Sequence, residues 1–150
     1  SDPPGVATGF PAIINRRLGR GRVIWTAAPI ERFSIQSPRH RSVFVNIIRS
    51  LAPDSFSFEA DAPSCVEIVQ FHKPDERRYL LSIVNFQSEI GVPNIPVSDI
   101  LLKVKVKVKS PAVSSLPDEK PLPFEQEGEY LRIRIPTLQT FRMLAIDYKV

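Results

Sequence analysis

The sequence predicts a mainly β protein, in which an antiparallel β-sandwich follows a β-hairpin and one α-helix. Three observations support this fold class. From Asp54 onward, short apolar runs alternate with polar turns at the spacing of an antiparallel sandwich. In one of these runs, residues 100–109, apolar side chains alternate with lysines without a break from Leu102 to Lys109. The 15 prolines against 6 glycines also favour short elements, because proline interrupts helices and central strands.

The run at residues 100–109 predicts one long strand with an apolar face and a cationic face. Successive side chains of a strand point to opposite faces, whereas a helical period would scatter the valines around the axis. At ~3.3 Å per residue such a strand would be about 30 Å long. We expect the apolar side chains in the core and the lysines in solvent; the apolar positions are Leu102, Val104, Val106 and Val108. The lysine stripe also permits binding to a polyanion, but the run lacks the aromatic side chains on which bases would stack.

Further strands are predicted on both sides of this run. The run at 79–86 is apolar enough for a central strand, and the run at 130–135 alternates regularly. Loops are predicted at 90–97 and 117–123, where prolines occur. The remaining predicted strands are 55–59, 66–71, 113–116 and 141–148.

The first fifty residues predict a hairpin and a helix. Two β-type runs flank Leu18-Gly19-Arg20-Gly21, so residues 11–28 form a hairpin in which both glycines supply positive φ angles. Ser37 and Pro38 are a helix-start signal, and Pro53 ends the helix. The helical spacing predicts one buried apolar stripe; its members are Val43, Phe44, Ile47, Ile48 and Leu51.

Length and composition limit the class of protein. The 150 residues, 43% of them hydrophobic, suit one domain, or one domain and a fragment of another. No apolar run approaches the ~20 residues of a membrane span, and no signal peptide is visible. The chain begins with Ser-Asp rather than Met, which suggests processing or a cut from a longer protein. A single cysteine, Cys65, excludes an internal disulfide and a cysteine-based zinc site, and we expect a buried inert thiol.

The positive charge gathers in the first third of the chain. Residues 1–50 hold eight arginines and two acidic residues, whereas residues 51–150 hold twelve basic and fourteen acidic residues. A basic segment can attract nucleic acid or another anion, or it can contact an acidic neighbouring domain. We favour the neighbouring domain.

The sequence contains no constellation that indicates catalysis, a cofactor or a metal. Gly19-Arg20-Gly21-Arg22 lacks the spacing and the Lys-Ser/Thr of a phosphate-binding loop. His40 and His72 have no partner at metal-ligand spacing. Glutamates 125, 127 and 129 alternate beside a turn and are expected to project into solvent, whereas a glycosidase pair must converge across a cleft. Aromatic side chains could stack on sugars if exposed, but inside β runs they usually belong to the core; they are Trp25, Phe33, Tyr79 and Tyr130.

Several stretches resemble the C-terminal region of β-galactosidase-type glycoside hydrolases. Pro11-Ala12-Ile13-Ile14-Asn15 with Leu18-Gly19-Arg20-Gly21-Arg22-Val23-Ile24-Trp25 is similar to the end of their glutamine-amidotransferase-like (flavodoxin-like) trimerisation domain. The helix around Asn46-Ile47-Ile48-Arg49-Ser50-Leu51 fits the final helix of that domain. Ala62-Pro63-Ser64-Cys65-Val66-Glu67-Ile68 and Arg78-Tyr79-Leu80-Leu81-Ser82-Ile83-Val84-Asn85-Phe86 are similar to the start of their C-terminal β-sandwich, with Ser82 where histidine is typical. The resemblance covers roughly residues 9–150, and its motifs are structural.

This resemblance implies two domains and a non-catalytic role. Residues 1–53 would be the hairpin and helix left over from an α/β (flavodoxin-like) domain, and residues 54–150 the complete sandwich. The catalytic glutamates of that family lie in an upstream TIM barrel, so no residue here inherits them. The chain would serve domain packing or oligomerisation, with no cofactor and no membrane, and its partner would be the upstream catalytic domain of the same polypeptide or another subunit. The predicted interface consists of Arg16, Arg17, Arg20, Arg22, Trp25, Arg41 and Arg49.

Three other functions remain open from the sequence. A carbohydrate-binding sandwich module would need exposed coplanar aromatic side chains on one sheet face. An anion or nucleic-acid binder would use the arginines and the lysine strand, and its binding would depend on salt. A small independent enzyme would need converging catalytic groups, which the sequence does not indicate.

Overall fold

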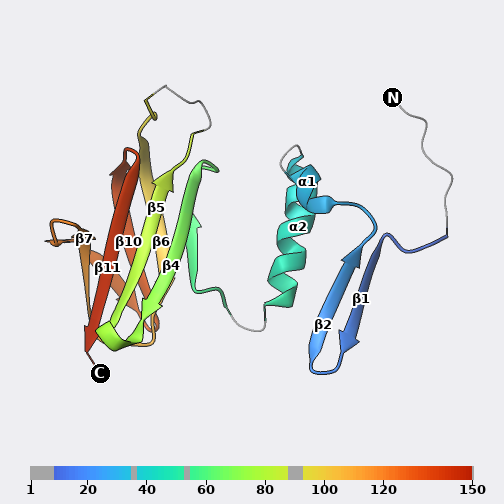
Figure 1. The fold of residues 1–150 in the computed structure, drawn as a ribbon, viewed down its shortest axis with the longest axis horizontal. Coiled ribbons are helices and arrows are strands. Elements are labelled where there is room, and N and C mark those ends of the chain that lie inside the picture. Colours follow the sequence, from blue (N-terminus) through green and yellow to red (C-terminus); the bar gives the residue numbers. More distant parts are fainter. Residues whose placement is uncertain (1–8, 35–36, 53–54, 88–92, 150) are drawn as a thin grey trace. The chain divides into compact units, whose positions relative to one another are not determined.

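The computed structural model describes residues 9–34, 37–52, 55–87 and 93–149 (Figure 1). The chain forms two compact units, Ser1–Ser55 and Phe56–Val150. The first unit contains a hairpin and two helices, and the second contains two antiparallel sheets. Within the described residues, no helix is long and apolar enough to cross a membrane.

The predicted hairpin is confirmed in the first unit. Strand β1 (Ile13–Leu18) pairs antiparallel with β2 (Gly21–Thr26), and Leu18 lies opposite Gly21. Gly19 takes a φ of +57° at the first position of the two-residue turn, where glycine has no Cβ to clash. Gly21 is the first residue of β2 and has no positive φ, so the expectation of two positive-φ glycines was wrong for this position.

The predicted helix is also present. Helix α2 spans Pro38–Leu51, with proline in its first turn, and ends where the Ala52 N–H donates to the Ile48 carbonyl at 3.2 Å. Ser37 occupies the N-cap position in an extended conformation, but its hydroxyl makes no capping hydrogen bond. A short helix that the sequence pattern did not indicate, α1 (Ile30–Ser34), precedes it.

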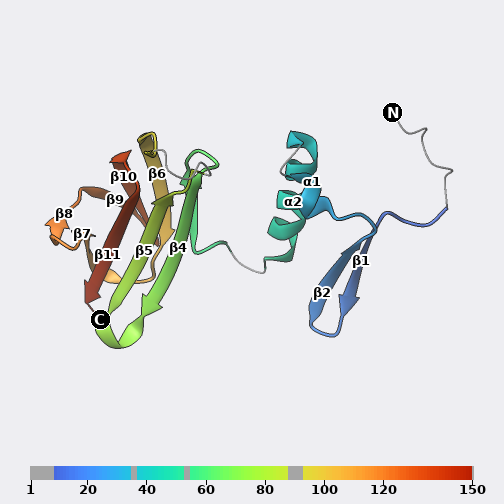
Figure 2. The same ribbon diagram turned by 45° about the horizontal axis from the view of Figure 1, so that its top comes forward.

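The second unit is a β-sandwich of two antiparallel sheets, as predicted (Figures 1 and 2). One sheet has the order β3-β6-β10-β9 and the other the order β4-β5-β11-β7-β8. The first sheet consists of β3 (Phe58–Asp61), β6 (Val97–Lys105), β9 (Phe124–Glu127) and β10 (Tyr130–Leu138). The second consists of β4 (Val66–Lys73), β5 (Arg78–Asn85), β7 (Lys109–Leu116), β8 (Lys120–Pro121) and β11 (Phe141–Lys149), with the 3-10 turn Pro74–Glu76 between β4 and β5.

Alternating apolar side chains from both sheets fill the core. Every second residue is buried from Ile100 to Val104 in β6 and from Leu131 to Ile135 in β10, which is the two-residue period of a strand with one covered face. Val97 and Leu138, which lie opposite each other, are also buried but stand three positions from Ile100 and Ile135. The predicted central strand β5 lies between β4 and β11 and contributes Leu81 and Ile83, both fully buried. Burial of each such side chain stabilises the fold by roughly 1.5–3 kcal/mol. The sandwich therefore has the core that a folded domain requires.

The predicted long lysine/valine strand is interrupted. Strand β6 ends at Lys105, and the chain leaves the first sheet over residues 106–108 before β7 begins in the second sheet. Val106 is only 1% exposed, and its N–H donates to the Glu129 carbonyl at 2.7 Å. The alternation continues through this crossing because valine still faces the core that both sheets share. Leu102, Val104 and Val106 are buried as predicted, and Val108 packs against the core half-buried.

Asn85 is the one polar side chain buried among the described residues, at 1% exposure. Its amide Nδ2 donates to the carbonyls of Ile95 at 2.8 Å and Gln139 at 2.7 Å. Its Oδ1 accepts from Gln87 Nε2 at 3.0 Å, and its own carbonyl accepts from Asn94 Nδ2 at 2.6 Å. Asn85 thus satisfies its polar atoms and joins the end of β5 to the segments before β6 and after β10.

Three further boundaries differ from the sequence-based expectations. Strand β6 begins at Val97, inside the predicted loop 90–97, of which residues 90–92 lie outside the described part of the chain. The turn region 117–123 contains the short strand β8, after a cis Leu116–Pro117 peptide bond. Of the glutamates predicted beside a turn, 125 and 127 lie in strand β9 and 129 lies in the turn after it, and all three side chains are exposed as predicted.

Candidate functional site

The candidate functional site is the surface of the first unit, where the predicted interface residues lie. Arg16, Arg17, Arg20, Arg22 and Trp25 belong to the hairpin. Arg41 and Arg49 belong to α2, and all seven side chains are exposed. The structure therefore gathers five of them on one hairpin and leaves the other two on the helix.

One face of the hairpin is linked to the helix by Arg22. Residues opposite each other in an antiparallel pair share a face, so Arg22 lies with Arg17 and with Asn15, Ile24 and Ile13. Arg22 Nε donates to Asn15 Oδ1 at 3.2 Å, and its Nη1 donates to the Ser50 carbonyl at 3.2 Å. Arg22 therefore connects the hairpin to the last turn of α2, in addition to carrying surface charge.

The opposite face of the hairpin is apolar apart from Arg16. Ile14 lies opposite Trp25, Arg16 opposite Val23, and Leu18 beside the turn. Trp25 is 53% exposed, Val23 48% and Leu18 71%. A tryptophan normally buries 150–250 Å² of surface on packing, so this face leaves much of its apolar surface in solvent. We call Ile14, Arg16, Leu18, Val23 and Trp25 the hairpin outer face.

The helices add further exposed apolar surface. Phe33 of α1 lies 5.7 Å from the His40 ring, and Arg41 Nε donates to the Ser34 carbonyl at 3.3 Å, so α1 is held against the start of α2. Phe44 and Ile47 are half-buried, whereas Val43, Ile48 and Leu51 are exposed, and no described residue of α2 is buried. The predicted buried stripe was therefore wrong as to burial, because the first unit offers the helix too little to pack against.

The four-stranded sheet of the sandwich carries neighbouring charged pairs on its outer face. Across the sheet β3-β6-β10-β9, Arg132 pairs with Glu127 at 3.0 Å and Arg134 with Asp99 at 2.7 Å. The ammonium of Lys103 lies 4.4 Å from the centre of the Tyr130 ring. Glu129 lies 4.0 Å from the ammonium groups of both Lys105 and Lys107. Lys103, Lys105 and Lys107 of the alternating run thus have acidic or aromatic neighbours within the sandwich.

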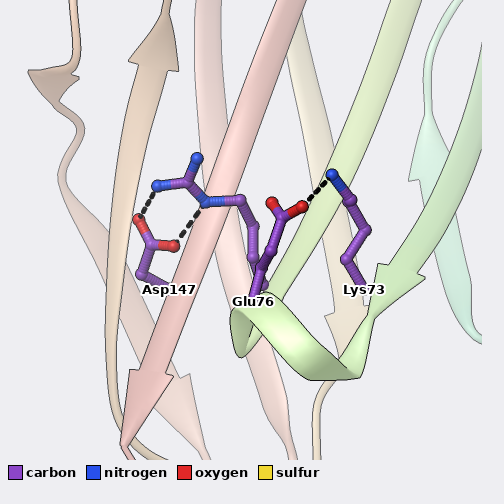
Figure 3. A network of polar contacts seen from close by, with 4 residues as sticks. Lys73, Glu76 and Asp147 are labelled. Atoms are coloured by element: carbon purple, nitrogen blue, oxygen red, sulfur yellow. Dashed lines mark hydrogen bonds and ion pairs between the residues drawn. The ribbon is translucent and has the colours of Figure 1, made fainter.

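A second charged pair lies at the turn between β4 and β5 (Figure 3). Arg78 donates two hydrogen bonds to Asp147, from Nε at 2.6 Å and from Nη2 at 3.0 Å, and Lys73 pairs with Glu76. The hydrogen bonds to Asp147 raise the pKa of the Arg78 guanidinium. This bidentate pair joins the neighbouring strands β5 and β11 at Arg78 and Asp147, which lie opposite each other.

The histidines and the cysteine have structural surroundings. His72 stacks on Tyr79 with ring centres 4.1 Å apart, and its Nε2 lies 3.0 Å from the Tyr148 hydroxyl. Burial raises the pKa of the Tyr79 phenol above its ordinary value of 10.0, and the charge of Tyr148 adds to this shift. Cys65 is half-buried against the core. No group of three or more potential metal ligands occurs among the described residues.

No protein-family model and no curated protein sequence matches this chain. Among solved structures, the chain is similar to α-L-fucosidase isoenzyme 2 from Paenibacillus thiaminolyticus, with a TM-score of 0.74 and 18% sequence identity. The similar region covers 95% of this chain and 22% of that chain, so this chain spans only a small part of that enzyme's length. At this level of identity the likeness concerns the fold. The similar structure is a fucosidase, and the β-galactosidase type that the sequence resembles is not the type found.

Proposed function

We propose that this chain is a non-catalytic accessory region of a glycoside hydrolase, in which the first unit packs against another domain or subunit. Two findings support the proposal. The fold is shared with a segment of a longer α-L-fucosidase chain, and the first unit exposes the apolar side chains that a packing surface requires.

The exposure of the first unit is the observation that carries the proposal. No residue of either helix is buried, and the hairpin outer face leaves Trp25 53% exposed. A two-stranded hairpin is marginally stable in water without a covering layer. Exposed apolar surface of this extent usually marks an interaction site. A covering partner would bury Leu18, Val23 and Trp25 together with the exposed side of α2.

The arginines give this surface a preferred partner. Arg16 lies within the hairpin outer face and Arg20 lies in the turn next to Leu18, whereas Arg17 lies on the opposite face of the hairpin. Basic side chains within and next to an apolar surface fit a partner surface that carries acidic side chains, since the charge pairs orient the two surfaces. We propose that the partner is the catalytic domain of the same polypeptide or a neighbouring subunit.

Hydrogen exchange with and without the partner tests the proposal. The polypeptide encoded by the complete reading frame should protect the amides of β2 and α2 more strongly than the isolated 150-residue chain does. The sandwich strands β5 and β10 serve as the internal control, because their core is complete in the chain alone. Equal protection of α2 in the two proteins, or a reading frame without a catalytic domain, would contradict the proposal.

A turnover assay tests the non-catalytic part separately. The purified chain should release no 4-nitrophenol from a panel of 4-nitrophenyl glycosides that includes the α-L-fucoside. Activity that stays with the chain through purification would show that the account misses a catalytic site.

A further inference from the structure

The four edge strands of the sandwich differ in how well they resist pairing with another strand. The two sheets end in β3 and β9, and in β4 and β8. Strands β3 and β9 have four residues each and carry acidic side chains, and β8 has two residues, one of them Pro121. Shortness, charge and proline are the features that keep an edge from pairing. Strand β4 has eight residues, and none of them is proline or glycine.

The side chains of β4 favour pairing. Val69 is 49% exposed and Phe71 55% exposed, side by side on the outer face of the five-stranded sheet. Glu67 and Lys73 lie on the same face, one on each side of this apolar pair. Along its length, the outer face of β4 therefore presents one acidic side chain, two apolar side chains and one basic side chain, in that order.

The main chain of β4 has a free edge. The Phe86 N–H donates to the Cys65 carbonyl at 2.7 Å, so these opposed residues form a hydrogen-bonded pair between β4 and β5. In an antiparallel ladder such pairs alternate, so the N–H and C=O groups of Ile68, Gln70 and His72 point away from β5. Among the described residues, no main-chain hydrogen bond reaches these groups from that side.

Gln70 adds a second, independent observation at the middle of this edge. Its Oε1 is the one buried side-chain oxygen or nitrogen of the described residues that has no hydrogen-bond partner. Buried polar atoms are nearly always paired, so an unpaired acceptor requires an explanation. The Gln70 side chain projects from the centre of β4, opposite Leu81 of β5.

We propose that two copies of this chain associate through β4, which pairs antiparallel with β4 of the second copy around a two-fold axis at Gln70. The two five-stranded sheets then continue as one sheet, and the outward groups of Ile68, Gln70 and His72 form about six main-chain hydrogen bonds. Each Gln70 amide lies opposite its symmetry mate, where the unpaired Oε1 can accept from the partner subunit's Gln70.

The charges select this register. With Gln70 on the axis, Glu67 lies opposite the partner subunit's Lys73, and Val69 lies opposite the partner subunit's Phe71. A shift of the axis to Phe71 would bring Glu67 opposite the partner subunit's Asp75, which is a like-charge pair. A shift to Val69 would bring Glu67 opposite the partner subunit's Phe71. Only the Gln70 register joins opposite charges at both ends of the apolar pair.

This inference goes beyond the proposed function, because it concerns the sandwich and not the surface of the first unit. A symmetric pairing is isologous, so it closes at two copies and leaves no edge for further growth at β4.

Charge reversal at the two ends of β4 tests the proposal. Sedimentation equilibrium of the 150-residue protein should show a monomer–dimer equilibrium. Glu67→Lys alone, or Lys73→Glu alone, creates like-charge pairs and should raise the dissociation constant roughly tenfold. The double variant restores opposite charges and should return the dissociation constant close to the original value. Glu125→Lys, the same change on exposed strand β9, is the matched control and should have no effect.

Gln70→Pro tests the main-chain pairing. The Gln70 N–H points away from β5, so proline there removes an edge hydrogen bond without removing one from the sheet. This variant should be monomeric with an unchanged β-type circular dichroism spectrum. If Gln70→Pro unfolds the sandwich, the charge-reversal set decides alone. A protein that is monomeric at all concentrations would overturn the proposal, as would a dimer weakened by Trp25→Ser but indifferent to the changes in β4.

Discussion

The Asn85→Asp substitution tests how the sandwich holds its connecting segments. The aspartate has nearly the same shape as asparagine, but its ionised side chain cannot donate. The two donations from Nδ2, at 2.8 Å to Ile95 and 2.7 Å to Gln139, would become close contacts between a carboxylate and two carbonyl oxygens. At 1% exposure, water cannot reach the side chain to compensate.

The expected loss follows from these two bonds. Each buried group left without its partner costs about 1–3 kcal/mol, and the buried negative charge adds to this penalty. We therefore expect the free energy of unfolding to fall by about 3–5 kcal/mol at pH 7. The loss should shrink at low pH, because burial raises the pKa of the introduced carboxyl and its protonated form can donate one hydrogen bond.

Tyrosine circular dichroism during urea unfolding measures this loss selectively. All three tyrosines of the chain, Tyr79, Tyr130 and Tyr148, lie in the sandwich, whereas the single tryptophan, Trp25, lies in the first unit. Asn46→Asp on the exposed surface of α2 is the matched control and should change stability by less than about 0.5 kcal/mol. A loss below about 1 kcal/mol for Asn85→Asp, or equal losses for both variants, would refute the role assigned to Asn85.

Two further predictions concern the first unit and the end of the sandwich. Ile48→Glu on α2, where the side chain is 44% exposed, should change the free energy of unfolding in urea by less than about 0.5 kcal/mol. Leu102→Ala in the core should lower it by about 2–5 kcal/mol. Similar losses for the two variants would mean that α2 is packed in the isolated chain. The raised pKa of Tyr79 means that the folded state holds this proton more tightly than the unfolded state, so its stabilising contribution is complete below pH 10.0 and is lost as pH rises through the folded-state pKa. Tyr79→Phe should therefore flatten the fall of stability in alkaline solution, and an unchanged slope would contradict the burial of this phenol.

The strands of the sandwich were predictable because alternation of side chains is a local property. The two-residue period identifies the core-facing residues from Ile100 to Val104 in β6 and from Leu131 to Ile135 in β10, and burial in the structure agrees there. Buried Val97 and Leu138 fall outside this period. The crossing after Lys105 was not predictable from this period. Val106 and Val108 both face the core that the two sheets share, although the chain passes from one sheet to the other at these residues. The alternation therefore does not indicate where the chain changes sheet.

The helix shows the limit of the same reasoning. Its period grouped five apolar side chains in one stripe, but a period states only which side chains share a face. The five are Val43, Phe44, Ile47, Ile48 and Leu51. Whether that face is covered depends on other elements, and the described part of the first unit has too few of them. The free edge of β4 was hidden for a related reason, since the position of a strand in a sheet follows from topology and not from its own residues.

We propose that the first unit lacks a core of its own and packs against a partner. Hydrogen exchange on the isolated 150-residue protein measures this directly. We predict that amides of β1, β2 and α2 exchange with little protection, while those of β5, β6, β10 and β11 are protected to the level of global unfolding. Protection of α2 equal to that of the sandwich strands would contradict the claim.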